Sequence, residues 1–263
     1  MAELRVLQAI GGGARGGAEL QFTRLAIALA RAGLRQHILV RPDEERTAAL
    51  KAGGIEPVEL PFGGILDFRT RAGFRREIDR FDPHVVLTWM NRATAFCAGP
   101  RRARGYVHVA RLGGYYKLRH YRHCDHLIAN TADIAAYIRR SGWPAERAHV
   151  LPNFVHADPA PPMPRETFAT PDGVPLILSL GRLHHNKAFD VLLAAMVELP
   201  GVWLWLAGSG PAAAALTRQA ARLGIAERVR FLGWRDDLPA LAAAADAIVV
   251  PSRHEPLGNV VLE

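Results

Sequence analysis

Short apolar runs alternate with longer segments of helical periodicity in the first 155 residues. LRVLQAI (4–10) is an apolar run that opens into glycines, and in AELQFTRLAIALARAGL (18–34) apolar residues return at helical spacing. This pattern predicts a strand, a glycine loop and a helix. Further strands are predicted at 37–40, 84–89 and 125–130, and a further helix at 131–142. Alternating strands and helices predict a parallel sheet that is covered on both faces.

A second alternation begins after a proline-rich segment. HADPAPPMPRETFATPDGVP (156–175) lacks periodicity and predicts a linker. Beyond it, strands are expected in PLILSLGR, VWLWLAGSG, RVRFLGW and DAIVVPS, and helices in DVLLAAMVEL, AAAALTRQAARLG and LPALAAAA. We therefore expect an α/β protein with a first domain at 1–155, a linker at 156–175 and a second domain at 176–263. Because the chain ends in the first turns of a helix, we expect the second domain to be incomplete and the chain to be poorly active.

Composition narrows the class of protein. With 49% hydrophobic and 22% charged residues among 263, the chain reads as soluble and globular. The amino terminus lacks a basic start, and no 18 apolar residues run together, which predicts a cytoplasmic protein without a membrane span. Cys97 and Cys124 have neither disulfide-scaffold nor zinc-finger spacing.

Positive charge is concentrated in the first part of the chain. Residues 1–165 carry a net charge of +10 and residues 166–263 a net charge of −2. Such a field suits an anionic partner, such as a phosphorylated glycolipid, a membrane surface or nucleic acid. An arginine-rich composition that merely aids solubility explains it equally well.

The first glycine loop matches a dinucleotide-binding pattern. GGGARG (11–16) fits G-x-G-x-x-G between a predicted strand and helix, where glycines let a pyrophosphate approach the backbone. The acidic residue expected after the second strand is replaced by Arg41, which suits a 2′-phosphate. The loop is therefore compatible with an NADP-dependent oxidoreductase, or with a tight turn that binds nothing.

Two cations follow a predicted strand of the second domain. In LSLGRLHHNKAFDVLLAA (178–195), Arg182 comes just after the strand and Lys187 just before a helix. Ligands of open α/β sheets bind at this end of the strands, and two cations there suit a diphosphate. Either cation alone is more typical of a solvated surface. GSGP (208–211), with Gly208 and Gly210, repeats the strand–glycine–helix turn beside the same edge.

The last residues, SRHEPLGNVVLE (252–263), follow another predicted strand. Pro256 and Gly258 disfavour helix, and Asn259 is a favourable N-cap for NVVLE. Glu255 is therefore expected in a loop and Glu263 in a first helical turn. Carboxylates at these positions can accept hydrogen bonds from two sets of hydroxyls.

Residues 176–263 resemble the carboxyl-terminal domain of the retaining glycosyltransferases of family 4, which have the GT-B fold of two Rossmann-like domains facing across a cleft. The matching features are GRL with Lys187, GSGP, FLGW followed by DLPALAAAADAIVVPS, and the Glu-x7-Glu motif in EPLGNVVLE. GGAELQFTRLAIALARAGL is similar to the family's GG-x-E loop and helix. These features cover most of the chain.

The resemblance implies sugar transfer from a UDP-, GDP- or ADP-sugar with retention at the anomeric carbon, without a metal or other cofactor. It implies that Arg182 and Lys187 neutralise the donor diphosphate and that Glu255 holds hydroxyls of the donor sugar. Other implied donor-binding residues are Gly16, Gly17, Gly208, Gly210, Leu257, Gly258, Asn259 and Glu263, the last on the ribose. The resemblance implies attack on the same face of the sugar, with the leaving phosphate taking the acceptor proton. Both glutamates are therefore interpreted as residues that bind substrate hydroxyls and not as an acid/base pair.

The sequence departs from the family pattern at two positions. The glycine that often follows the lysine is Ala188, a mild change. Many members carry a histidine after a middle strand of the first domain, where His108 is too early and Arg111 or Gly113 is closer to the expected place. The sequence therefore identifies no catalytic residue in the first domain.

RLGGYYKLRHYRHCDHLI (111–128) interleaves tyrosines with cations. It suits an anionic membrane surface or a lipid-linked acceptor, as in lipopolysaccharide-core glycosyltransferases, which the chain resembles, or equally a surface helix with its aromatics turned inward. The residues assigned to this acceptor or membrane side are Arg111, Tyr115, Tyr116, Lys117 and Arg119. His120, His123, Cys124 and His126 suggest zinc, but nothing else completes a metal motif, and no nucleic-acid reader motif is present.

The function predicted is a hexosyltransferase-type glycosyltransferase acting on a bacterial surface glycan or glycolipid such as lipopolysaccharide. We expect it in the cytoplasm, peripherally on the inner membrane face. The rivals are an NADP-dependent oxidoreductase and a catalytically silent nucleotide-binding or membrane-associated fragment. The sequence leaves open the donor's base and sugar, the acceptor and the oligomeric state.

Overall fold

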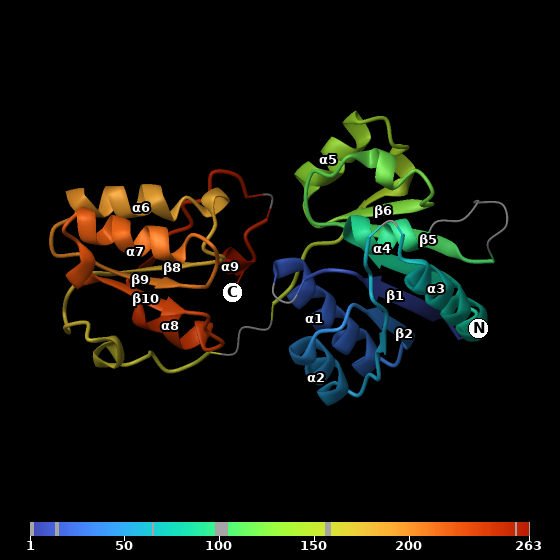
Figure 1. The fold of residues 1–263 in the computed structure, drawn as a ribbon, viewed down its shortest axis with the longest axis horizontal. Helices are drawn as coiled ribbons and strands as arrows, with labels where there is room; N and C mark the ends of the chain where they lie inside the picture. The colour runs from blue at the N-terminus through green and yellow to red at the C-terminus, as the bar shows by residue number, and fades with distance from the viewer. Residues whose placement is uncertain are drawn as a thin grey trace. The chain divides into compact units, whose positions relative to one another are not determined.

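The structure is a computed structural model that describes residues 3–13, 16–64, 66–97, 105–155, 159–255 and 257–262. The chain divides into two compact units, Met1–Phe154 and Val155–Glu263. Each unit contains a parallel sheet with its own helices (Figure 1), which confirms the expected two-domain α/β architecture.

The sheet of the first unit has the strand order β3-β2-β1-β4-β5-β6-β7, and its neighbouring strands are parallel. Its strands are β1 (Arg5–Ile10), β2 (Arg35–Val40), β3 (Val58–Glu59), β4 (Val85–Trp89), β5 (Val107–Leu112), β6 (His126–Ala129) and β7 (Ala148–Val150). Its helices are α1 (Gly17–Arg31), α2 (Glu44–Ala52), α3 (Phe68–Phe81), α4 (Met90–Phe96) and α5 (Ala132–Arg140). The strands expected at 4–10, 37–40, 84–89 and 125–130 are all present, with ends shifted by at most two residues.

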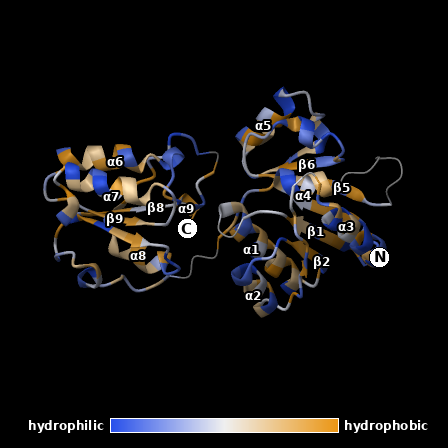
Figure 2. Cartoon of the chain, viewed as in Figure 1, coloured by the Kyte–Doolittle hydropathy of each residue, from blue (hydrophilic) through white to orange (hydrophobic). Residues whose placement is uncertain are grey.

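Helices cover both faces of this sheet because side chains alternate along each strand. Leu7 of β1 packs in a cluster with Phe74 of α3, whereas Ile10 packs with Phe22 of α1. Figure 2 shows the resulting contrast between apolar strands and polar outer helix faces. The predicted two-sided cover is therefore confirmed.

Three helices of the first unit, α2, α3 and α5, begin at side chains that accept hydrogen bonds from free backbone amides. Asp43 accepts a hydrogen bond from the amide of Arg46 at the start of α2, at 2.9 Å. Thr131 accepts one from the amide of Ile134 at the start of α5, at 3.1 Å. Such caps fix the points at which the chain leaves the sheet and enters a helix.

The second unit has a parallel sheet with the order β10-β9-β8-β11 among its described residues. Its strands are β8 (Leu176–Leu180), β9 (Trp203–Ala207), β10 (Val229–Gly233) and β11 (Ala247–Ile248). Its helices are α6 (Phe189–Ala195), α7 (Ala213–Arg222), α8 (Leu238–Ala244) and α9 (Asn259–Leu262). The pattern in the sequence predicted each of these strands and helices in this order.

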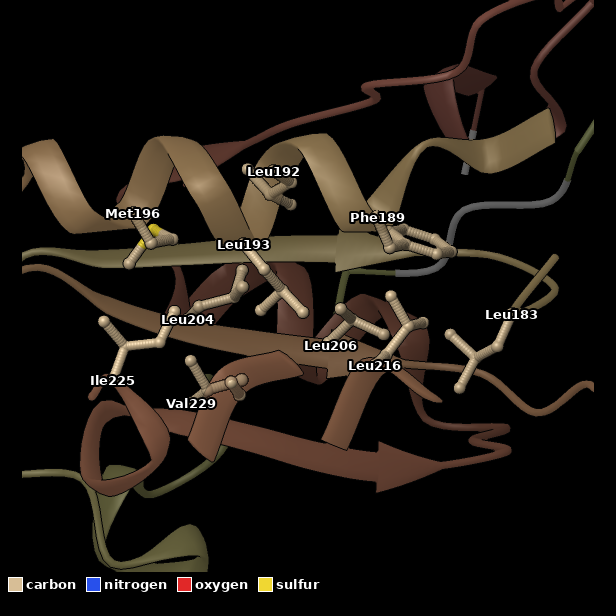
Figure 3. Packing of buried hydrophobic residues seen from close by; sticks show 11 residues of the cluster. Leu183, Phe189, Leu192, Leu193, Met196, Leu204, Leu206, Leu216, Ile225 and Val229 are labelled. Carbon is tan, nitrogen blue, oxygen red and sulfur yellow. The ribbon is translucent and has the colours of Figure 1, made fainter. Parts of the chain in front are cut away.

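The core of the second unit lies between α6, α7 and the sheet. Figure 3 shows Phe189, Leu193 and Met196 directed toward Leu204 and Leu206 of β9. These side chains are almost completely buried. Because each buried aliphatic or aromatic side chain contributes about 1.5–3 kcal/mol, this core holds α6 at a fixed position over the sheet.

The proline-rich segment 156–175 is more than a linker. Its residues 156–158 lie outside the described part of the chain. Beyond them, the amide of Met163 donates to the carbonyl of Ala240 at 2.9 Å, and Trp205 Nε1 donates to Thr170 Oγ1 at 2.8 Å. Arg165 donates to the carbonyl of Ala244 at 2.9 Å. The segment lacks helical periodicity and was therefore predicted to be a linker. Its described residues nevertheless form hydrogen bonds with the second unit.

Within the part of the chain that the structure describes, every helix is too short or too polar to cross a lipid bilayer.

Candidate functional site

Of the three residues predicted as catalytic, Arg182, Lys187 and Glu255, the carboxyl ends of β8 and β11 bring Lys187 and Glu255 into contact. Lys187 follows the turn after β8, and its Cε lies 3.5 Å from the position that a Cβ on Gly181 would take. Its Nζ forms an ion pair with Oε2 of Glu255, which lies in the loop after β11. Both side chains are about three-quarters buried, with 23% and 24% exposed. The structure thus joins two residues that the sequence placed at one sheet edge but did not predict as a pair.

The loop that carries Glu255 is fixed by polar contacts. Ser252 Oγ donates to Oε2 of Glu255 at 3.0 Å. Arg253 forms a two-pronged ion pair with Asp190 of α6, at 2.9 Å and 2.6 Å. Hydrogen bonding from Arg253 lowers the pKa of Asp190 below its ordinary value. Two parallel hydrogen bonds between a guanidinium and a carboxylate hold geometry well, so this clamp orients the loop.

The remaining predicted donor residues surround the same edge. Arg182 follows Gly181 directly and is exposed. Leu257, Gly258 and Asn259 are half-buried, and α9 begins at Asn259, one residue earlier than the predicted N-cap implies. Glu263 lies outside the described residues. An exposed cation beside a lysine–glutamate pair leaves a net positive edge, which suits an anionic ligand.

Gly208 and Gly210 have a packing role that needs no ligand. A Cβ on Gly208 would lie 1.9 Å from the carbonyl oxygen of Gly181, and one on Gly210 would lie 2.4 Å from that of Leu183. Both glycines have φ angles, +141° and +157°, that side chains rarely permit. These glycines let the turn after β9 press against the turn that carries Arg182.

Ala188 is a larger departure than the sequence indicated. Its φ is 52° and ψ 31°, in the left-handed region, immediately before α6. A residue with a Cβ costs about 1–2 kcal/mol there, which explains why glycine suits the position. The chain accepts this strain while Ala188 is buried beside Lys187.

The first glycine loop is closed by a carboxylate. A Cβ on Gly12 or Gly16 would lie 2.0 Å or 2.3 Å from a carboxylate oxygen of Glu19, the glutamate of GG-x-E. Gly16 is the N-cap of α1, and Gly17 is its first residue. A dinucleotide pyrophosphate would meet this negative charge where the fingerprint requires free backbone, which disfavours the NADP-dependent interpretation.

Arg111 is not on the surface. It lies at the end of β5 with 3% of its surface exposed, and its guanidinium carbon is 5.0 Å from the ring centre of Trp89. Nη2 donates to the carbonyl of Leu151 at 2.9 Å and to Asn153 Oδ1 at 2.8 Å. Burial lowers the pKa of Arg111 to about 10. Arg111 is therefore an internal cation of the first unit and not part of a membrane-facing surface.

The basic aromatic stretch is not a surface helix. It contains the end of β5, a 3-10 turn at Leu118–His120 and the start of β6. Tyr121 is fully buried and donates to Asn91, and Tyr116 is half-buried. Tyr115, Lys117 and Arg119 are exposed. The aromatics are therefore mostly turned inward, and the cations form the outer surface.

The histidines and the cysteine of this stretch differ in exposure. Cys124 is buried, whereas His120 and His123 are exposed. Among the described residues, no three His, Cys, Asp or Glu side chains are grouped so that they could hold a metal ion.

Sequence reasoning missed the residues that position Glu255. Ser252, Arg253 and Asp190 were not assigned, although Ser252 and Arg253 lie within the segment that follows β11. Asn130 was missed too, although it directly follows β6 and is buried. The rule that selected Arg182, a polar residue after a parallel strand, would have found Asn130.

Two family profiles match the chain. The profile described as Glycosyltransferase Family 4 matches residues 15–159, and that described as Glycosyl transferases group 1 matches residues 174–263. The lipopolysaccharide core biosynthesis glycosyltransferases LpsD and LpsE of Rhizobium meliloti strain 1021 are each 35% identical over 258 residues. Each match covers 95% of this chain and 73% of the relative.

Solved structures show the same fold. Anabaena HepE in complex with UDP-glucose has a TM-score of 0.84 at 21% identity, covering 98% of this chain and 77% of HepE. The lipopolysaccharide outer core galactosyltransferase WaaB in its apo form has a TM-score of 0.69 at 18% identity, covering 98% of this chain and 76% of WaaB. These likenesses confirm the predicted GT-B fold.

Proposed function

The chain belongs to Glycosyltransferase Family 4, and from this premise we propose that it transfers a hexose from a UDP-sugar to a lipopolysaccharide core acceptor, with retention at the anomeric carbon. The observation that carries the proposal is the convergence of Arg182, Lys187 and Glu255 at one sheet edge of the second unit. The two cations there can neutralise the diphosphate of a sugar nucleotide, and the carboxylate can accept hydrogen bonds from the hydroxyls of its sugar.

Lys187 and Arg182 would stabilise the diphosphate as it leaves. Cleavage of the bond between the anomeric carbon and the phosphate oxygen transfers the electron pair to that oxygen, so negative charge develops there. Fixed cations lower the transition-state energy most when they face such developing charge. The acceptor oxygen attacks from the face that the phosphate leaves, and its proton passes to the released phosphate.

Glu255 would hold the sugar and not act as an acid. Its Oε2 already accepts hydrogen bonds from Ser252 and Lys187, which keeps the carboxylate oriented as an acceptor. Hydroxyls of the donor sugar are donors of the kind that a carboxylate binds. The amides around Leu257 to Asn259 would support the same sugar, and Glu263 the ribose.

The donor and acceptor classes come from the relatives. HepE has been solved with UDP-glucose, which supports UDP as the nucleotide to test first. LpsD and LpsE carry names of lipopolysaccharide core biosynthesis and are 35% identical to this chain over 258 residues. That identity over most of the chain supports an acceptor of the same class.

If Glu255 binds the donor sugar, its substitution should lower the rate of sugar transfer without unfolding the protein. Glu255→Gln keeps the shape but removes the charge, so kcat/KM for sugar transfer should fall by at least about tenfold, since hydrogen bonds to charged groups contribute about 1.5–3 kcal/mol. Glu227→Gln, at an exposed position of the same unit, should leave transfer unchanged. Transfer is followed by release of UDP, and the anomeric configuration of the product by NMR. Equal rates in both variants, or an inverted product, would contradict the assignment.

We also propose a peripheral position on the inner membrane face. The first 165 residues carry a net charge of +10, and Lys117 and Arg119 are exposed cations after β5. Such cations attract anionic lipid. Reversal of both charges to glutamate should weaken sedimentation with vesicles that contain anionic lipid by about 30-fold or more, since each cation contributes about 1 kcal/mol. Binding that neither salt nor the substitutions affect would exclude this surface.

A further inference from the structure

The first unit contains a buried cation that the structure does not neutralise. The guanidinium of Arg111 is held from three directions, by the ring of Trp89 and by the oxygens of Leu151 and Asn153. Its Nη1 atom is buried, and no hydrogen-bond partner for it exists among the residues that the structure describes. The ion pairs that the structure describes do not include Arg111. Buried arginines are normally paired with an anion, so the missing partner calls for a ligand.

A second unpartnered side chain, that of Asn130, follows the neighbouring strand β6. Trp89, Arg111 and Ile128 are register partners on β4, β5 and β6, and Asn130 lies two residues beyond Ile128. Side chains two residues apart on a strand share a face. The Oδ1 atom of Asn130, which is 7% exposed, has no hydrogen-bond partner among the described residues.

Helix α1 adds a third such group. Phe22 of α1 packs edge-to-face on Trp89, with ring centres 5.5 Å apart. Its neighbour Gln21 is 1% exposed, and neither its Nε2 nor its Oε1 atom has a partner among the described residues. Because Gln21 adjoins Phe22 on α1 and is itself buried, it belongs to the part of the helix that faces the sheet.

Gly113 gives this cluster an opening. It is exposed, and a Cβ built on it would meet a single described neighbour within 4 Å, Nδ2 of Asn130 at 3.8 Å. The space above Gly113 therefore reaches the side-chain amide nitrogen of Asn130. The exposed cations Lys117 and Arg119 follow in the same loop and give the approach a positive field.

We propose that Arg111, Asn130 and Gln21 form an oxyanion-binding subsite of the first unit, which takes a carboxylate or phosphate group of the glycan acceptor. The inference rests on the proposed function for the identity of the ligand as acceptor. An anion, unlike water, supplies both the missing hydrogen-bond acceptor for Nη1 and the missing negative charge. The guanidinium is already immobilised by Leu151 and Asn153, so binding costs little ordering of the arginine. The two amide side chains would hold the hydroxyls next to the anionic group.

Calorimetric titration of the whole chain with sodium glucuronate, inorganic phosphate and neutral glucose, at constant ionic strength, tests the subsite. The variants are Arg111→Gln, which removes the charge, and Gly113→Leu, which fills the space beside Asn130 and keeps the charge of Arg111. Gly113 is not at a positive φ, so leucine fits its backbone. Gly64→Leu is the matched control, because Gly64 is exposed, has no neighbour within 4 Å and is not at a positive φ.

The wild type and Gly64→Leu should bind an anion that an equal concentration of glucose does not displace. Both Arg111→Gln and Gly113→Leu should lower the affinity for that anion by about tenfold or more, as for loss of a charged hydrogen bond. Preference for glucuronate or for phosphate would identify the carboxylate or the phosphate as the source. Equal anion affinity in all four proteins, or no anion binding by the wild type, would overturn the proposal. UDP is titrated in parallel: failure to bind UDP would count against the proposed function, while the anion titration still decides the subsite.

Discussion

Replacing Gly208 by alanine is expected to unfold the second unit at temperatures where the wild type is stable. The new Cβ would lie 1.9 Å from the carbonyl oxygen of Gly181. That peptide cannot retreat, because the amide of Gly181 donates to the carbonyl of Ala207 at 3.0 Å, and the amide of Gly208 donates to that of Gly233 at 2.6 Å. Backbone strain and overpacking each cost about 1–3 kcal/mol, and a domain's total stability is only about 5–15 kcal/mol.

Gly224→Ala separates the clash from the backbone preference. Gly224 also has a positive φ, +68°, but nothing lies within 4 Å of the position of its Cβ. It should therefore cost only the left-handed penalty of about 1–2 kcal/mol. Urea unfolding followed by circular dichroism measures both variants. Similar losses of stability for Gly208→Ala and Gly224→Ala would show that the turn after β9 is not packed against Gly181 as described.

Replacing Lys187 by alanine is expected to abolish donor binding in practice. The variant loses a charged hydrogen-bond donor to phosphate and also leaves the carboxylate of Glu255 without its ion-pair partner. Loss of the charged donor should lower the affinity for UDP by about 10- to 100-fold. Repulsion between the freed carboxylate and the phosphate should lower it further. Arg218→Ala, which removes an exposed cation from α7, should bind UDP as the wild type does.

The double variant Lys187→Ala/Glu255→Gln tests the coupling of the pair. Because it removes the unpaired charge, it should bind UDP more tightly than Lys187→Ala alone. If both variants lose the same affinity, Glu255 lies too far from the bound phosphate to repel it. If Lys187→Ala binds UDP normally, the sheet edge has been assigned wrongly.

The sequence was informative where function follows from topology. Arg182 and Glu255 are far apart in the chain, yet each follows a parallel strand, and the carboxyl ends of such strands share one edge. That rule suffices to bring them to one side of the second sheet. It does not predict that Glu255 meets Lys187, since this contact depends on a loop held by Arg253 and Asp190, which are separated by 63 positions.

Burial was the feature that the pattern of residues predicted least well. Arg111 was assigned to the acceptor or membrane side, but it is buried, because β5 continues through it. Ala188 read as a mild substitution because φ cannot be deduced from residue type alone. In each case the position is set by tertiary packing, which overrides local composition.

Titration of the chain with UDP, GDP, ADP and NADPH shows whether the carboxyl edge of the second sheet is a nucleotide-sugar site. We expect one nucleoside diphosphate, UDP, to bind selectively, with the affinity lost in Lys187→Ala. Binding of NADPH alone would contradict this assignment and would instead indicate that the first glycine loop and Arg41 form the nucleotide site.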